Sequence, residues 1–147
     1  MKCVISIGAN IGQPQENVNA AINLLSKEFA NFQQSKLYLT KPVGYLDQPD
    51  FTNAVVIGNT KKSPYEVLKF LQQIEEEFGR QRDIKWGPRT LDLDLIDCGL
   101  IMLDEVLTLP HPRASERKFV LEPWFELEPD GVLTGIGPIK DLLANLS

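Results

Sequence analysis

The order of strand-like and helix-like patterns constrains the fold of this chain more than any other feature of its sequence. Short β-branched or alternating apolar runs predict strands, and apolar residues that repeat every three or four positions predict helices. The patterns predict strand, helix, strand, strand, helix and strand at residues 4–7, 14–27, 32–40, 51–57, 64–78 and 91–98. This order is typical of a ferredoxin-like αβ sandwich, an α+β fold with a βαββαβ core and a mainly antiparallel sheet.

Signals at the helix ends and in the tail complete this interpretation. Pro14 suits the first position of a helix, and Ser63 with Glu66 forms a capping-box pattern at the start of the second. Gly79 is expected to cap the end of that helix. The added C-terminal elements are predicted as strands at 100–103 and 107–109, a helical turn at 119–127 and a short helix after Pro138.

Length and charge exclude several classes of protein. At 147 residues the chain is expected to form one domain, residues 1–147. Its 15 basic and 20 acidic side chains give a formal charge of -5, which argues against nucleic acid as a partner. No apolar run reaches the length of a membrane span or a signal sequence, so we expect a cytoplasmic protein without membrane contact. We also expect a monomer.

Cys3 and Cys98 lie in apolar runs and are expected to be reduced core residues.

Two carboxylates mark the last predicted strand. Asp92 and Asp94 alternate with leucines, so they share one face of the sheet with Cα atoms roughly 6.5–7 Å apart. Like charges this close need compensation, and Mg²⁺ binds a few carboxylate oxygens together with water and phosphate oxygens. The pair could hold one ion between them or one ion each. The alternative is a solvent-facing edge strand with ordinary alternation.

A basic loop precedes these carboxylates. Residues 79–89 carry four cations, Arg80, Arg82, Lys85 and Arg89, together with Trp86. Carboxylates for the metal and cations for the phosphate oxygens are the two requirements of a bound magnesium triphosphate. The alternative is a solvated loop whose arginines cap the helix or pair with the glutamates at 75–77. The sequence lacks a phosphate-binding loop of the GxxxxGK[ST] type, so a nucleotide would be held by side chains and metals.

Several stretches resemble one enzyme family. Residues 85–96 read KWGPRTLDLDLI, and further similar stretches are SIGAN at 6–10, DQPDFTNA at 47–54 and LPHPR at 109–113. They closely resemble the motifs of the 6-hydroxymethyl-dihydropterin pyrophosphokinases of folate synthesis, over nearly the whole chain. Two departures are Pro112, where some relatives carry tyrosine, and a basic loop about one residue shorter.

The resemblance implies a reaction and a set of site residues. The pterin hydroxymethyl oxygen would attack the β-phosphorus of ATP and release AMP, with no side-chain base. Asp92 and Asp94 would hold two Mg²⁺ ions, and Arg82 and Arg89 would neutralise the transferred group. The other implied ATP contacts are Gln72, Glu75, Arg80, Lys85, Trp86, His111 and Arg117. For the pterin, Asn53 would bind the ring edge and Phe51 and Phe119 its faces. Thr40, Val43 and Gly44 would line the same slot.

Two other functions remain as alternatives. The first is a non-catalytic ferredoxin-like domain that binds a small molecule or RNA. Its RNA-binding version would have exposed aromatic residues on the central strands and a basic sheet face, whereas this face carries Asp92 and Asp94. A metal-dependent phosphohydrolase would use the same carboxylates but would leave the pattern of Phe51, Asn53 and Phe119 unexplained.

Overall fold

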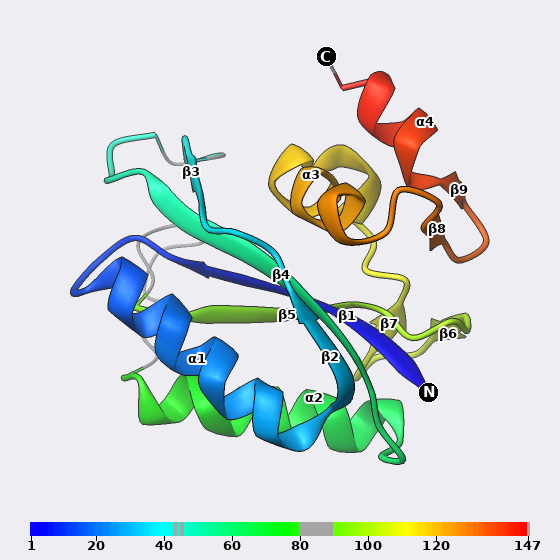
Figure 1. Ribbon diagram of the computed structural model, residues 1–147, viewed down its shortest axis with the longest axis horizontal. Coiled ribbons are helices and arrows are strands. Elements are labelled where there is room, and N and C mark those ends of the chain that lie inside the picture. Colours follow the sequence, from blue (N-terminus) through cyan, green and yellow to red (C-terminus); the bar gives the residue numbers. More distant parts are fainter. Residues whose placement is uncertain (43, 45, 80–89, 147) are drawn as a thin grey trace.

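The computed structural model describes residues 1–42, 44, 46–79 and 90–146. A five-stranded antiparallel sheet forms its centre, with helices packed on both faces (Figure 1). The elements of the core are β1 (Lys2–Ala9), α1 (Pro14–Glu28), β2 (Ala30–Gln34), β3 (Tyr38–Thr40), β4 (Phe51–Asn59), α2 (Pro64–Glu77) and β5 (Asp92–Asp97). The structure thus confirms the α+β class.

The order of the strands places β1 in the middle of the sheet. The order is β2-β4-β1-β5, with β3 also paired to β4, and every described pair is antiparallel. Gly8 of β1 therefore lies between Asn53 of β4 and Asp92 of β5, and Ser6 lies opposite Asp94. Among the described strands, β5 is an edge strand.

The two faces of the sheet carry separate apolar layers. α1 and α2 cover one face, and α3 (Lys118–Leu127) covers the other, with α4 (Ile139–Ala144) packed against α3 (Figure 1). Leu91, Leu93 and Leu95 belong to the α1–α2 layer, as do the free, buried Cys3 and Cys98. The predicted alternation along β5 is therefore confirmed, and Asp92 and Asp94 lie on the other face.

The helix starts follow the predicted signals, and one helix end differs. Pro14 begins α1, and Ser63 caps α2, where the Ser63 hydroxyl accepts from the Glu66 amide at 3.2 Å. The Glu66 carboxylate accepts from the Ser63 amide at 3.0 Å, which completes the capping box. At the other end, Phe78 is the C-cap and Gly79 follows it in the left-handed region at φ 72°. Gly79 was predicted to be the C-cap, but the C-cap is the residue before it, and Gly79 is the first residue after the helix.

The predicted strand at 32–40 is two strands, β2 and β3. The interruption lies at Ser35, whose hydroxyl accepts from the Val55 amide at 3.0 Å while its own amide donates to the Val55 carbonyl at 2.9 Å. A side-chain oxygen here replaces a backbone acceptor, so the chain leaves the regular ladder. The prediction of one continuous strand at 32–40 was therefore wrong.

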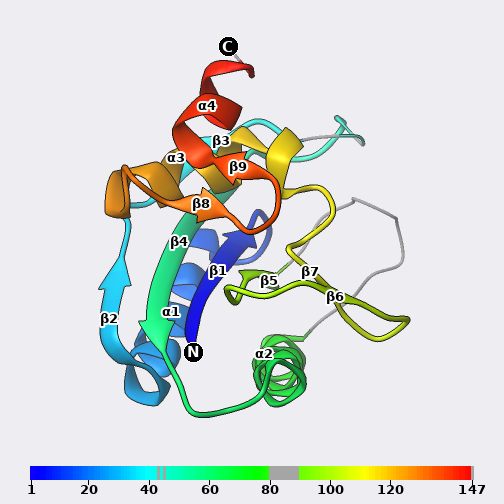
Figure 2. The same cartoon turned by 90° about the vertical axis from the view of Figure 1, so that its right-hand side faces the viewer.

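The tail adds two hairpins at the end of the sheet that holds the N-terminus (Figure 2). One pairs β6 (Met102–Leu103) with β7 (Thr108–Leu109), and the other pairs β8 (Val132–Leu133) with β9 (Gly137–Pro138). The predicted turn at 119–127 is the complete helix α3, which follows a short 3₁₀ turn at Ala114–Glu116. Within the described chain, no helix has the length and apolar character to span a membrane.

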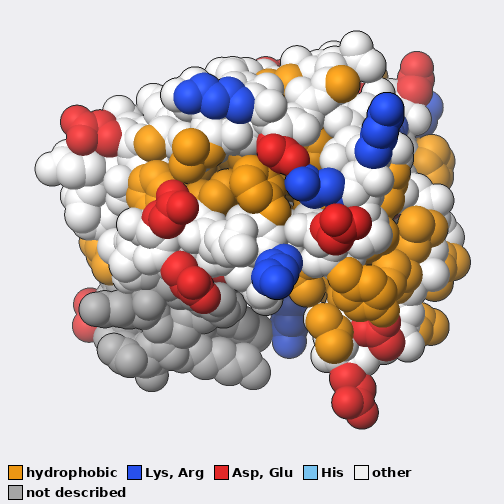
Figure 3. Space-filling model, turned by 90° about the horizontal axis from the view of Figure 1, so that it is seen from below, with side chains coloured by type: hydrophobic (Ala, Val, Ile, Leu, Met, Phe, Trp, Pro, Cys, Tyr) orange, Lys and Arg blue, Asp and Glu red, His pale blue; other side chains and the backbone are white. Residues whose placement is uncertain are grey.

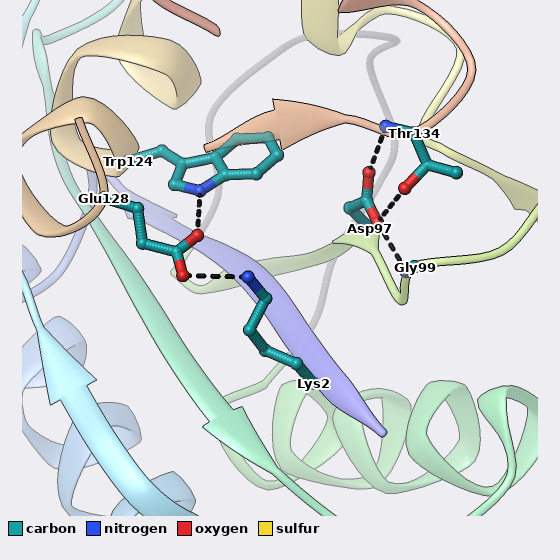
Figure 4. A network of polar contacts seen from close by, with 6 residues as sticks. All are labelled: Lys2, Asp97, Gly99, Trp124, Glu128 and Thr134. Atoms are coloured by element: carbon teal, nitrogen blue, oxygen red, sulfur yellow. Dashed lines mark hydrogen bonds and ion pairs between the residues drawn. The ribbon is translucent and has the colours of Figure 1, made fainter. Parts of the chain in front are cut away.

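Asp97 joins the second hairpin to the end of β5. Its carboxylate accepts from the Thr134 amide at 2.7 Å, the Thr134 hydroxyl at 2.8 Å and the Gly99 amide at 2.6 Å (Figure 4). The side chain is only 4% exposed, and three donors satisfy a charge that would otherwise be costly to bury. The tail is thus fixed to β5, the strand that carries Asp92 and Asp94, which we call the acidic pair.

Candidate active site

A cavity of about 710 Å³ opens on the sheet face that carries the acidic pair. Strands β1, β3, β4 and β5 contribute to its wall, together with α3 and the 3₁₀ turn. Seven of the predicted site residues line it: Thr40, Phe51, Asn53, Asp92, Asp94, Arg117 and Phe119. β4 and β5 both pair with β1, so the sheet brings Phe51 and Asn53 of β4 close to Asp92 and Asp94 of β5.

Asp92 and Asp94 form the acidic side of the cavity. Both are half-buried, and the Asp94 Oδ2 lies 3.7 Å from the Arg117 Nη1. Among the described residues, no cluster of three or more His, Cys, Asp and Glu side chains is placed to hold a metal. Two carboxylates beside an open cavity suit Mg²⁺, which keeps several water ligands, better than a closed structural zinc site.

Arg117 links the acidic side to an aromatic wall. Its guanidinium carbon lies 5.5 Å from the centroid of the Phe119 ring, within the range of a cation–π contact. Arg117 precedes α3 and Phe119 is in its first turn, so one short segment supplies both groups. A cation and an aromatic face thus stand next to each other in the cavity.

The opposite wall is built around Asn53. This side chain is 3% exposed, and its amide nitrogen donates to the Thr40 hydroxyl. Phe51, two residues earlier on β4, lines the cavity on the same face. Gly8 faces Asn53 across the β1–β4 pair, and a Cβ atom there would lie 2.7 Å from the Asn53 Oδ1. The absence of a side chain at Gly8 is therefore a condition for the position of Asn53.

His111 lies outside the large cavity and lines a smaller one of about 280 Å³. Burial and the nearby positive charge of Arg117 lower the pKa of His111 from 6.5 to about 4, against an opposing effect of Asp92. The imidazole is therefore neutral at physiological pH. Its Nδ1 accepts from the Arg113 amide at 3.2 Å, which leaves the proton on Nε2 as a hydrogen-bond donor.

Three further predicted residues are not in the wall of the large cavity. Gln72 is exposed on α2, and Gly44 is exposed in the segment between β3 and β4. Glu75 is 2% exposed, and its carboxylate accepts from the Leu93 amide at 2.8 Å. The remaining predicted residues lie outside the described part of the chain: Val43, Arg80, Arg82, Lys85, Trp86 and Arg89.

Some residues of the cavity had no predicted role. Ser6 and Gly8 contribute from β1, and Arg113, Lys118 and Glu122 contribute from the segment around α3. Gly8 carried a signal, since a glycine that ends an apolar strand often marks a close approach of another group. Lys118 and Glu122 carried none, because a helix predicted only as a turn gives no information about which of its faces meets the sheet.

Comparison with known proteins identifies the family. The model of the 7,8-dihydro-6-hydroxymethylpterin-pyrophosphokinase family matches residues 4–129. A 2-amino-4-hydroxy-6-hydroxymethyldihydropteridine pyrophosphokinase of Pseudomonas aeruginosa is 40% identical over 95% of this chain and 88% of its own length. The enzyme of the same name from Bacillus subtilis is 43% identical over 84% of this chain and 75% of its own length. A mitochondrial folate synthesis bifunctional protein of Arabidopsis thaliana is 42% identical over 84% of this chain, which spans 23% of that protein. The chain belongs to the 7,8-dihydro-6-hydroxymethylpterin-pyrophosphokinase family.

Proposed function

We propose that this chain transfers the diphosphate of ATP to the hydroxymethyl group of 6-hydroxymethyl-7,8-dihydropterin, a step of folate biosynthesis. AMP is the second product. Family membership supports the reaction. The single structural observation that carries it is one cavity that brings together two kinds of group, an acidic pair beside the cation Arg117, and the Asn53 amide with the rings of Phe51 and Phe119. The first suits a metal-bound phosphate chain, and the second suits a flat heterocycle.

The pterin is proposed to lie between Phe51 and Phe119, with Asn53 along the ring edge. Phenyl rings stack well on a flat heterocycle, and an amide offers both a donor and an acceptor to its edge. Thr40 fixes the Asn53 amide by accepting from its nitrogen, so the Asn53 oxygen has a defined direction. Val43 and Gly44 remain predicted members of this slot.

The metal is proposed to be Mg²⁺, two ions held by Asp92 and Asp94. Their exposure to an open cavity and the small number of carboxylates fit this ion. When bound, Mg²⁺ neutralises charge on the phosphate oxygens and lowers the barrier to nucleophilic attack. The two aspartates supply ligand oxygens from one rigid strand, which limits their relative motion.

Arg117 and His111 are proposed to bind phosphate oxygens. The Asp94–Arg117 pair is long and partly exposed, and such pairs contribute about 0–1 kcal/mol. Arg117 can therefore exchange Asp94 for a phosphate oxygen at little cost. A neutral His111 with its proton on Nε2 acts as a donor and not as a base. Arg82 and Arg89 are the proposed catalytic cations, with Gln72, Arg80, Lys85 and Trp86 as nucleotide contacts.

We assign no side-chain base to the reaction. The rate enhancement comes from positioning the hydroxymethyl oxygen in line with the β-phosphorus and from stabilising the charge that builds up there. The rigid strands β4 and β5 carry the two binding walls, so the relative position of the substrates depends on the sheet itself.

The fold is proposed to be ferredoxin-like, in a single domain of residues 1–147. The antiparallel order β2-β4-β1-β5 and the two helices on one face support this assignment. The elements from β6 onward are additions. We also propose a cytoplasmic monomer that does not bind nucleic acid. Acidic and basic side chains are mixed on the α1–α2 face, and the described part of that face carries no continuous basic surface (Figure 3).

The proposed reaction is tested by following AMP after mixing the purified protein with ATP, Mg²⁺ and 6-hydroxymethyl-7,8-dihydropterin. AMP should form only when the pterin is present. It should disappear in Asp94→Ala and remain in Asp130→Ala, an exposed aspartate outside the cavity. ADP or inorganic phosphate in place of AMP would instead indicate a phosphohydrolase, and no consumption of ATP would indicate a binding module.

A further inference from the structure

Glu75 occupies an unfavourable position for a carboxylate. It lies in the last turn of α2, where the helix dipole is negative, and it is only 2% exposed. Its neighbours Glu76 and Glu77 are exposed. Burial and the helix end both disfavour the charge of Glu75, so a specific interaction must compensate for them.

The hydrogen bond to Leu93 supplies such an interaction. Glu75 Oε2 accepts from the Leu93 amide at 2.8 Å, and Leu93 belongs to the edge strand β5. β1 pairs with the other side of β5, with Ile7 opposite Leu93. The Leu93 N–H is directed toward α2, so Glu75 supplies the acceptor that a further strand would supply at this edge.

Leu93 separates the two carboxylates of the site. Its side chain packs in the apolar layer under α1 and α2, whereas Asp92 and Asp94 point into the cavity on the other face. A shift or rotation of the Leu93 peptide would move the aspartates on either side of it, because successive side chains of a strand are fixed by the same backbone. The Glu75 hydrogen bond therefore holds the segment that sets the spacing of the pair.

We infer that Glu75 is a positioning residue for the Asp92–Asp94 pair, acting through the Leu93 amide from the opposite face of the sheet. This inference rests on the proposed function of the pair as the Mg²⁺ ligands. It gives Glu75 a role other than the direct ATP contact that the family resemblance implies. Partners that orient metal ligands typically change metal affinity 10–100-fold when they are removed.

Three variants separate this role from its alternatives. Glu75→Gln keeps a side-chain oxygen that can accept from Leu93, and Glu75→Met keeps a similar length without an acceptor. Glu76→Gln is the matched control, because it changes an exposed glutamate of the same helix turn. Hydrogen exchange of the Leu93 amide, measured by NMR without metal or nucleotide, reports the hydrogen bond independently of activity. Calorimetric titration with Mg²⁺ in the presence of a non-hydrolysable ATP analogue reports the ligand pair.

In Glu75→Met, the Leu93 amide should exchange at least about tenfold faster, and Mg²⁺ affinity should fall roughly 10–100-fold. The Mg²⁺ concentration that gives half-maximal activity should rise in parallel, and kcat should recover at high Mg²⁺. Glu75→Gln should stay within about threefold of the unaltered protein in both measurements, since it retains the acceptor. Glu76→Gln should be unchanged.

Two results would overturn the inference. Faster Leu93 exchange in Glu75→Met with unchanged Mg²⁺ affinity would make the hydrogen bond purely structural. Equal losses of ATP-analogue affinity in Glu75→Gln and Glu75→Met, without a change in Leu93 exchange, would make Glu75 a direct nucleotide contact. A failure of the proposed reaction itself is distinguishable, because the unaltered protein would then form no AMP while the exchange of Leu93 still responded to Glu75.

Discussion

Replacement of Gly8 by alanine tests the geometry of the pterin wall with a single methyl group. Gly8 lies on β1 between Asn53 and Asp92, and the added Cβ would lie 2.7 Å from the Asn53 Oδ1 and 3.7 Å from the Phe51 Cδ1. The second contact is ordinary. The first is too short, so Asn53 must move by roughly 0.5 Å to reach van der Waals distance. Gly8 has no positive φ, so the backbone itself accepts alanine without strain.

The expected loss of pterin affinity in Gly8→Ala depends on the hydrogen bonds that Asn53 is proposed to make to the pterin. Asn53 is 3% exposed and donates to Thr40, so it cannot move without disturbing that contact. Weakening one or two hydrogen bonds to the pterin should cost about 1–2 kcal/mol of binding free energy. The KM for the pterin should then rise roughly 5- to 30-fold. The KM for ATP should stay within about twofold, because the change is on the pterin side of the cavity.

Steady-state kinetics with the pterin as the varied substrate measure this effect, and a double-mutant cycle isolates its cause. In an Asn53→Ala background, Gly8→Ala should have little further effect on the KM for the pterin, because the group that the methyl displaces is gone. An unchanged KM in Gly8→Ala, with melting temperature preserved, would refute the account of this wall.

Three further predictions concern the acidic pair, the histidine and the tail. Asp94→Asn should reduce kcat at least about 100-fold while the melting temperature changes little, and Asp130→Asn should retain full activity; near-normal kcat in Asp94→Asn would contradict the metal assignment. His111 has a pKa lowered from 6.5 to about 4, so the unfolded chain binds its proton more readily and His111 should make the protein less stable as pH falls from about 6.5 to 4. Denaturant unfolding of His111→Asn should show a smaller loss of stability over this pH range, and an identical pH dependence would refute the shift. Asp97→Ala removes the acceptor of three hydrogen bonds, including both from Thr134, and should lower the free energy of unfolding by about 2–5 kcal/mol; a loss below about 1 kcal/mol would show that the link to the tail is weak.

Local patterns in the sequence were sufficient to predict many features of the core elements. Pro14 and the Ser63–Glu66 pair fixed the helix starts, because capping depends on residues close in sequence. The alternation of Asp92 and Asp94 with leucines predicted their common face, because side chains of a strand alternate wherever the strand lies.

Other features depended on contacts between distant segments. The break between β2 and β3 arises from hydrogen bonds of Ser35 with Val55, twenty residues away. The β8–β9 hairpin is held by Asp97, which is 37 residues from Thr134. The strands β8 and β9 have two residues each and carry no periodic signal of their own, so the sequence did not indicate them, whereas the apolar runs around β6 and β7 did predict strands there.

The same distinction applies to the site. Pairing of β1 with both β4 and β5 brings Phe51, Asn53 and the aspartates together, and only the family resemblance suggested that meeting in advance. The hydrogen bond between Glu75 and Leu93 joins a helix to an edge strand, and no local pattern in the sequence indicates that the Leu93 amide is the partner of Glu75.

In the proposed reaction, the diphosphate unit of ATP moves intact to the pterin in the cavity beside Asp92 and Asp94. The most direct measurement is a single-turnover reaction with ATP labelled at the γ-phosphorus in one experiment and at the α-phosphorus in another. All γ-label should appear in the pterin product and all α-label in AMP, with none in inorganic phosphate. Release of γ-label as inorganic phosphate, or the appearance of α-label in ADP, would contradict transfer of the intact diphosphate.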